Sequence, residues 1–226
     1  MSDCLVFSYE KRGKKMTEGD QVYIEALVNA KMLVEPVLEL GAGYGGRTNK
    51  NIIRNAGLTY FSSDIATSNS VDYLANFESD SVAIAFRDAP RFGTVLVLNV
   101  LEHTFDPVCV LDNARSLLVQ GGRLVVIVPA AWALHEYPID CYRFLPQWFD
   151  EYAARRQLDL PREYFRYIGL NRVDTYKDTK GSYQFPKPCT NVVRYQWSRG
   201  IHRFFNTFGR GMAYPCYLAI GAVFQS

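Results

Sequence analysis

A glycine-rich segment that follows a short apolar run constrains the fold of this chain more than any other feature. Residues 37–46 read Val-Leu-Glu-Leu-Gly-Ala-Gly-Tyr-Gly-Gly, the pattern of a strand that turns into a helix. Glycines at such a turn let the backbone approach a ligand closely, with N–H groups directed at it. Gly41, Gly43 and Gly46 also match the G-x-G-x-x-G spacing of dinucleotide-binding units, which is a weak signal by itself. The segment therefore predicts a nucleotide-containing ligand where a parallel strand meets a helix.

The charge just before the loop distinguishes between two ligands. Glu39 lies two residues before Gly41, so its carboxylate is expected beside the polar centre of the ligand. A carboxylate there repels the pyrophosphate of NAD but attracts the ammonium and sulfonium groups of S-adenosylmethionine. Glu39 therefore favours S-adenosylmethionine over a dinucleotide.

Strand and helix patterns alternate along the chain. Continuous apolar runs such as 94–98 are typical of buried parallel strands, and Asp106-Pro107 is a helix-start signal. This alternation predicts an α/β fold with a doubly wound, mostly parallel sheet. The expected strands are 33–40, 58–63, 71–74, 94–98, 124–128 and 217–224; the expected helices begin near Thr17 and cover 45–56, 79–87, 107–119 and 146–157, with Gly57 and Gly121-Gly122 as helix ends.

Length and composition limit the class of protein. The chain has 226 residues, 48% of them hydrophobic and 21% charged, which predicts a single domain over 1–226 with a large core. No apolar run approaches the ~18 residues of a membrane-spanning helix, and the first residues lack the layout of a signal peptide. The cysteines form no C-x-x-C pair, which favours reduced thiols and a cytoplasmic protein. These cysteines are Cys4, Cys109, Cys141, Cys189 and Cys216.

Polar residues follow two further predicted strands. Asp64 comes 19 residues after Gly45, where a βαβ unit places a carboxylate at the ribose of an adenosine ligand. The alternative for Asp64 is a helix N-cap. The pentapeptide Asn99-Val-Leu-Glu-His103 follows the strand at 94–98. Because ligands of open α/β sheets bind at the carboxyl ends of the strands, this pentapeptide is expected to face the same crevice as the glycine loop.

These segments together resemble the class I S-adenosylmethionine-dependent methyltransferases, in particular the type 11/12 group. The resemblance rests on 37–46, Asp64, and Val100–His103 followed by Asp106-Pro107, and it spans about residues 35–130. It implies a Rossmann-like, mostly parallel seven-stranded sheet with an antiparallel last strand, and S-adenosylmethionine as the cofactor.

The resemblance also implies roles for the matching residues. The glycine loop with Glu39 would hold the methionine end of the cofactor, and Asp64 would bind the ribose. Asn76 and Phe77 would flank the adenine, and Asn99 would complete the pocket. The full set of implied cofactor-binding residues is Glu39, Gly41, Ala42, Gly43, Tyr44, Gly45, Asp64, Ile65, Asn76, Phe77, Asn99 and Val100.

The segment 132–146 reads Trp-Ala-Leu-His-Glu-Tyr-Pro-Ile-Asp-Cys-Tyr-Arg-Phe-Leu-Pro. It resembles a pattern found in a subset of these methyltransferases, many of which are associated with glycan modification. His135 is the predicted general base, because imidazole can take a hydroxyl proton near neutral pH. Asp140 would orient His135, and Arg143 would bind substrate or pair with Asp140. The alternative is a structural Asp140–Arg143 ion pair beside a partly buried His135. Aromatic residues expected to line the cationic methyl group are Tyr44, Trp132 and Tyr137.

His103 is a further catalytic candidate, next to Glu102. Some relatives use an extended Glu-x-x-Glu-His to bind a divalent metal. Asn99 replaces the first acid here, which removes a carboxylate that a hard cation prefers. Glu102, His103 and His135 would still be able to form a site, but we predict that the protein uses no metal.

Basic and aromatic residues gather in the last third of the chain. Residues 1–154 hold 13 Lys and Arg against 19 Asp and Glu, whereas 155–226 hold 12 against 4. We interpret 155–213 as a basic and aromatic insertion that faces substrate or solvent. Its aromatic residues are Tyr164, Phe165, Tyr167, Tyr176, Tyr183, Phe185, Tyr195, Trp197, Phe204, Phe205 and Phe208.

Four interpretations of this insertion stay open. An acceptor-binding lid would stack aromatic rings on sugars or bases and use Arg to contact polar oxygens. A nucleic-acid surface is favoured by the positive charge, although no recognised RNA-binding motif is present. Peripheral contact with an anionic membrane would use alternating aromatic and basic residues. The fourth is a solvated basic face or a homodimer contact. The alternating residues are Trp197, Arg199, Arg203, Phe204, Phe205, Phe208 and Arg210.

The sequence therefore predicts an S-adenosylmethionine-dependent O-methyltransferase that acts on a sugar hydroxyl of a glycan or glycoconjugate. Two alternatives change the acceptor to a small phenolic or quinone-like molecule or to RNA. A third, an NAD-dependent oxidoreductase, depends on G-x-G-x-x-G alone.

Overall fold

The structure is a computed structural model that describes residues 18–42, 49–66, 71–132, 134–135, 139–169 and 218–225. It also describes the backbone of 173–175 and the single residues Trp197, Gly200, Ile201 and Phe204. The strands are β1 Val37–Leu40, β2 Tyr60–Asp64, β3 Tyr73–Leu74, β4 Phe92–Leu98, β5 Leu118–Pro129, β6 Arg166–Ile168, β7 Val173–Thr175 and β8 Ala219–Gln225. The helices are α1 Glu18–Asn29, α2 Lys50–Asn55, α3 Ser81–Ala85, α4 Pro107–Ser116 and α5 Pro146–Arg156, with 3₁₀ turns η1 Leu101–His103 and η2 Arg162–Tyr164.

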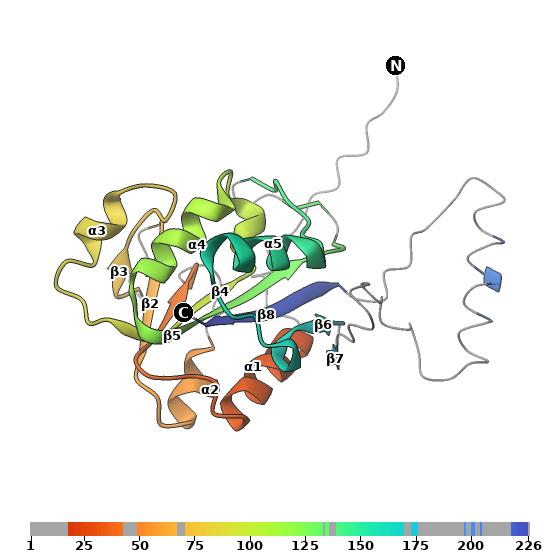
Figure 1. The fold of residues 1–226 in the computed structure, drawn as a ribbon, viewed down its shortest axis with the longest axis horizontal. Helices are drawn as coiled ribbons and strands as arrows, with labels where there is room; N and C mark the ends of the chain where they lie inside the picture. The colour runs from red at the N-terminus through yellow and green to blue at the C-terminus, as the bar shows by residue number, and fades with distance from the viewer. Residues whose placement is uncertain are drawn as a thin grey trace, which may run out of the picture.

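The described strands form one sheet in the order β3-β2-β1-β4-β5-β8-β6-β7 (Figure 1). Pairings from β3 to β5 are parallel, whereas β8 runs antiparallel to β5 and to β6. The doubly wound sheet with an antiparallel last strand is therefore confirmed. The expected number of seven strands is exceeded by one, because β7 adds a short antiparallel edge strand to β6.

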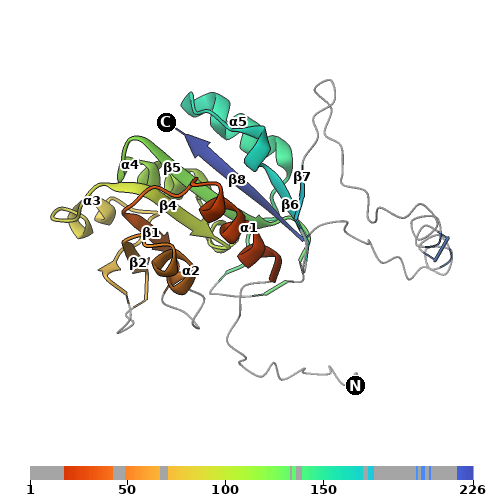
Figure 2. The same cartoon turned by 90° about the horizontal axis from the view of Figure 1, so that it is seen from below.

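Helices cover both faces of the sheet, and each face has its own apolar core. Helices α1 and α2 lie on one face, and α4 and α5 lie on the other (Figures 1 and 2). Ile24 and Leu27 of α1 are buried with Ile53 of α2, as the helical spacing of α1 predicts. Leu111 of α4 and Phe149 of α5 are buried in the opposite core. Because helices cover both faces, β4 is buried at every position and is almost entirely apolar.

Most element boundaries follow the sequence signals. Asp106 caps α4, because its Oδ1 accepts a hydrogen bond of 3.0 Å from the backbone N–H of Cys109. Gly57 follows α2 with a φ of +79°, as expected for a residue that ends a helix. The predicted end of α4 at Gly121-Gly122 is wrong: α4 ends at Ser116, and both glycines belong to β5.

The predicted insertion 155–213 is partly integral to the sheet. Phe165 and Tyr167 are fully buried, and β6 pairs with β8. Part of its aromatic content is therefore core, whereas Trp197 and Phe204 are exposed. Most of its remaining residues lie outside the described residues. None of the helices among the described residues is long and apolar enough to cross a membrane.

The strand register places the predicted site residues at one edge of the sheet. Leu40 of β1 is level with Ser63 of β2 and Val97 of β4, and Leu98 is level with Ile127 of β5. The chain segments that leave β1, β2, β4 and β5 therefore begin at the same edge. We call it the carboxyl edge.

Candidate active site

The beginning of the glycine loop is packed against the segment that follows β4. Gly41 has a φ of +69°, and a Cβ atom there would lie 2.7 Å from Cγ2 of Val100. Only glycine fits this position without strain. The backbone N–H of Ala42 donates to the carbonyl of Ser63 at 3.1 Å, which ties the loop to β2. The two segments predicted to share a crevice are therefore adjacent. Gly43, Tyr44 and Gly45 lie outside the described residues.

Glu39 is a buried carboxyl group at the base of this loop, only 3% exposed. Its Oε2 accepts hydrogen bonds from the Tyr60 hydroxyl at 2.8 Å and from the Asn49 backbone N–H at 3.0 Å. Its Oε1 accepts from Nδ2 of Asn49 at 3.2 Å. Burial raises the pKa of Glu39 to about 7, although these hydrogen bonds act in the opposite direction. Besides its predicted ligand role, Glu39 therefore joins β1 to the start of α2.

Asp64 is the last residue of β2 and is almost fully buried. Its Oδ1 accepts a hydrogen bond of 2.8 Å from the backbone N–H of Ala66, which fixes the turn after the strand. Ile65 between them is 65% exposed and offers an apolar surface at the carboxyl edge. Both residues stay candidates for the adenosine part of the ligand.

Of the two predicted adenine-flanking residues, Asn76 is half-buried and Phe77 is buried. Oδ1 of Asn76 accepts from the backbone N–H of Glu78 at 2.9 Å. Phe77 is buried in the core, with its ring centroid 5.8 Å from that of Phe86. Its carbonyl accepts from Nδ2 of Asn113 at 2.9 Å. Phe77 therefore packs inside the domain and presents little surface to a ligand.

Asn99 begins the segment after β4 in a left-handed conformation, with a φ of +54°. Its backbone N–H donates to Ile127 at 2.7 Å, and its Nδ2 donates to Oδ2 of Asp20 at 3.2 Å. Asp20 belongs to α1 and is 2% exposed. Asp20 was not among the predicted site residues, because its contact with Asn99 joins residues 79 positions apart in the chain. Through Asn99, α1 contributes a buried carboxyl group to the carboxyl edge.

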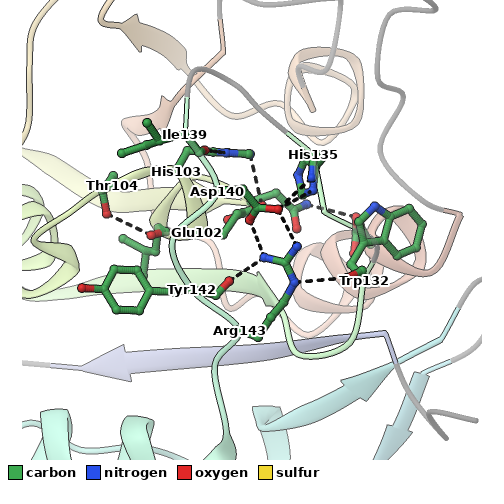
Figure 3. A network of polar contacts seen from close by, with 12 residues as sticks. Glu102, His103, Thr104, Trp132, His135, Ile139, Asp140, Tyr142 and Arg143 are labelled. Carbon is green, nitrogen blue, oxygen red and sulfur yellow. Dashed lines mark hydrogen bonds and ion pairs between the residues drawn. The ribbon is translucent and has the colours of Figure 1, made fainter. Parts of the chain in front are cut away.

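The four predicted catalytic residues form one polar network (Figure 3). His103 lies in η1, and its ring is perpendicular to that of His135 with 4.8 Å between centroids. Nε2 of His103 lies 3.6 Å from Oε1 of the buried Glu102. Nδ1 of His135 lies 3.3 Å from Oδ2 of Asp140, which also accepts from the His135 backbone N–H at 2.8 Å. Asp140 therefore fixes both the backbone and the imidazole of His135.

Arg143 holds Asp140 from the other side. Its Nη1 and Nη2 donate to the two carboxylate oxygens, the latter at 2.7 Å. These hydrogen bonds keep the pKa of Asp140 well below its usual range, although burial acts against them. Nε of Arg143 also donates to the Trp132 carbonyl at 3.3 Å. Of the two predicted roles of Arg143, the structure shows the pairing with Asp140.

Apolar side chains surround this network at the surface. Trp132, Leu134 and Ile139 are exposed on the segment after β5, and Phe105 is exposed after η1. The Tyr142 hydroxyl donates to the Phe105 carbonyl at 2.8 Å, which joins the two segments. Tyr137, the other aromatic predicted here, lies outside the described residues.

No protein-family model matches the sequence, and no curated protein matches it. Solved structures match its fold. A SAM-dependent methyltransferase from Archaeoglobus fulgidus has a TM-score of 0.51 at 13% identity, over 91% of this chain and 94% of that chain. The plantazolicin methyltransferase BamL, solved with SAH, has a TM-score of 0.52 at 12% identity, over 92% and 84%. The CurJ carbon methyltransferase has a TM-score of 0.51 at 15% identity, over 91% and 53%. The chain therefore has the fold of S-adenosylmethionine-dependent methyltransferases.

Proposed function

We propose that this protein is an S-adenosylmethionine-dependent methyltransferase that acts on a hydroxyl oxygen. The fold supports the reaction class. The observation that carries the proposal is the position of the network after β4 and β5, at the same edge of the sheet as the glycine loop. Donor-binding residues and a histidine–carboxylate pair therefore share the carboxyl edge, where ligands of open α/β sheets bind.

The residues at this edge fit the proposed donor. The close approach of Gly41 to Val100 provides backbone rather than side chain beside the ligand. Glu39 and Asp20 supply carboxyl groups suited to its ammonium and sulfonium charges, and Asp64 is suited to its ribose. When bound, S-adenosylmethionine supplies a methyl group already activated by its positive sulfur. The protein then has to align the acceptor and remove its proton.

His135 is the proposed general base. Asp140 faces Nδ1, so Nε2 is the atom that takes the proton. As the acceptor oxygen bonds to the methyl carbon and the carbon–sulfur bond breaks, the hydroxyl proton moves to Nε2 of His135. Asp140, held by Arg143, stabilises the imidazolium that results. Nε2 is buried, so the acceptor reaches it only after the covering side chains move.

A sugar hydroxyl of a glycan or glycoconjugate is the proposed acceptor. The likeness of segment 132–146 to glycan-modifying methyltransferases supports it, as does Trp132, whose exposed ring can stack on a sugar. A small phenolic or quinone-like acceptor and RNA are the alternatives. The exposed apolar residues around the network favour a phenolic or quinone-like acceptor, and the positive charge of 155–226 favours RNA.

Transfer of labelled methyl groups tests the proposal. The protein is incubated with S-adenosylmethionine labelled in the methyl group and with separate panels of glycans, phenols and RNA. We expect label in glycan hydroxyls, and less than a tenth of that rate with His135→Ala. Label found only in phenols would show that the acceptor is a phenol and not a glycan. Label found only in RNA would show that the acceptor is RNA, and RNA binding should then weaken as the salt concentration rises. Absence of transfer to every panel, together with absence of donor binding, would contradict the methyltransferase proposal.

A further inference from the structure

We infer that Glu102, His103 and His135 form a binding site for a divalent transition-metal ion of the Zn²⁺ type. Each residue offers one ligand atom, and these atoms all lie within 4.8 Å of one another. Glu102 and His103 come from η1, and His135 comes from the segment after β5. Figure 3 shows His103 and His135 above Asp140 and Arg143, with Glu102 beside Asp140. Two separate segments therefore bring nitrogen and oxygen donors to one point.

The contacts of the two imidazole rings indicate which nitrogen of each ring is available to an ion. Nδ1 of His103 lies 2.6 Å from the carbonyl oxygen of Ile139, and a carbonyl only accepts, so Nδ1 carries the hydrogen. Nδ1 of His135 likewise faces the Asp140 carboxylate. Each neutral ring then has its lone pair on Nε2. A histidine whose other nitrogen donates to a carboxylate or a backbone carbonyl is the usual arrangement around protein-bound metals.

The chemical type of the three ligand atoms indicates which ion the site prefers. Two imidazole nitrogens and one carboxylate suit Zn²⁺ and its neighbours, whereas Mg²⁺ and Ca²⁺ prefer oxygen ligands throughout. The nearby Asn99 has no carboxylate to add, and its Nδ2 donates to Asp20. Three protein ligands also leave a fourth position open for water or a ligand.

The three ligand atoms need to move only slightly closer together to bind an ion. Two ligands of a tetrahedral ion bound at ~2.1 Å lie roughly 3.4 Å apart. Oε1 of Glu102 and Nε2 of His103 are already 3.6 Å apart. No two of the three ligand atoms are more than 4.8 Å apart, so small side-chain rotations are expected to bring them to this spacing. Nε2 of His135 is buried, which an ion among the side chains tolerates better than a large substrate does.

This inference concerns binding and does not depend on methyl transfer. An ion at this site would occupy Nε2 of His135, the atom proposed to take the acceptor proton. Bound Zn²⁺ and proton removal by His135 therefore exclude each other, so the ion would act as an inhibitor of the proposed reaction.

Zn²⁺ titration of the metal-stripped full-length protein tests the site, with a chromophoric chelator as competitor and no donor or acceptor present. We expect one Zn²⁺ per chain. Glu102→Gln and His103→Gln should each weaken binding at least tenfold, and Asp140→Asn should weaken it by about 10–100-fold through His135. Cys141→Ser and His202→Ala are matched controls that should leave the affinity unchanged. Cys141 is an exposed thiol whose backbone N–H bonds to the Glu102 carbonyl, so its variant tests for a thiolate ligand.

Two results would overturn the inference: absence of stoichiometric binding, or equal affinity in the wild type, Glu102→Gln and His103→Gln. Thermal unfolding guards against misfolded variants. Zn²⁺ should raise the melting temperature of the wild type and of His202→Ala, but not that of a folded Glu102→Gln protein. An equal rise in Glu102→Gln would also reject the site.

Discussion

At the scale of single residues, Glu39 is predicted to couple donor binding to protonation. Its buried carboxyl group has a pKa of about 7, so the free protein holds a proton there at slightly acid pH. The ammonium group of a bound donor would stabilise the carboxylate and lower this pKa. We therefore predict that S-adenosylmethionine releases a proton on binding between about pH 6 and 7.

Calorimetry in buffers of different ionisation enthalpy measures this proton release. The wild type should release up to one proton per ligand near pH 6.5, and Glu39→Gln should release less. The release should fade at pH 8.5, where Glu39 is already ionised. Equal proton release by both proteins would show that another group is responsible.

His135 should affect turnover and not donor affinity, because its imidazole is proposed to act on the acceptor proton. We predict that His135→Ala lowers kcat by about 10²–10⁴-fold with little change in the affinity for S-adenosylhomocysteine. Asp140→Asn should lower kcat less, since it leaves the imidazole in place. Near-normal turnover in His135→Ala would reject this residue as the base.

Metal removal distinguishes the two roles of the Glu102–His103–His135 cluster. If His135 is the base, the protein should stay fully active in excess EDTA, and added Zn²⁺ should inhibit it. The measurement is the initial rate of methyl transfer against free Zn²⁺ concentration. Loss of activity in EDTA that a divalent ion restores would instead make the ion part of the catalytic machinery, against the sequence prediction.

Single residues differ in how well the sequence predicts their place. Glu39, Gly41 and Asp64 are at the ends of strands, so their spacing was enough to bring them to one edge. Asp20 was missed, because its contact with Asn99 exists only after α1 packs on the sheet. Phe77 is buried, which the sequence did not predict because a short segment does not show which side faces the core. Its place beside the adenine stays a prediction.

At the scale of elements, the junction between β1 and the glycine loop depends on Gly41. Gly41→Ala would place a residue with a side chain at a φ of +69° and bring its Cβ within 2.7 Å of Val100. The backbone effect costs about 1–2 kcal/mol. Crowding adds about 1–3 kcal/mol. We predict loss of stability and weaker donor binding.

Gly57→Ala is the matched control. Gly57 has a φ of +79°, but nothing lies within 4 Å of a Cβ added there. In urea unfolding, Gly57→Ala should lower the free energy of unfolding by the backbone contribution alone. Its affinity for the methyl donor should be normal. Val100→Ala combined with Gly41→Ala should recover part of the lost stability. Equal destabilisation by the two glycine substitutions would contradict the contact.

The sequence predicted those strands and helices that are long enough for their hydrophobic pattern to repeat. The parallel strands β1, β2, β4 and β5 were all expected. The start of β5 was placed too late, because Leu118 enters the sheet by pairing with Phe92 of β4, a contact that local sequence does not reveal. Strands β6 and β7 have three residues each, too few for an alternating pattern.

At the scale of the whole molecule, the fold and the charge distribution carry different information. The solved structures that share the fold have only 12–15% sequence identity with this chain. Alternating strands and helices with two apolar cores specify the architecture, and many different apolar residues can fill those cores. The fold implies the carboxyl edge as the ligand site. The proposed acceptor rests on segment 132–146 and on the basic residues of 155–226, and the fold alone does not predict it.

Calorimetry with S-adenosylhomocysteine and NAD discriminates directly between the two cofactors with which the glycine loop is compatible in sequence. We predict saturable binding of S-adenosylhomocysteine, weakened by Gly41→Ala and Asp64→Ala, and no binding of NAD. Tight binding of NAD without binding of S-adenosylhomocysteine would contradict it.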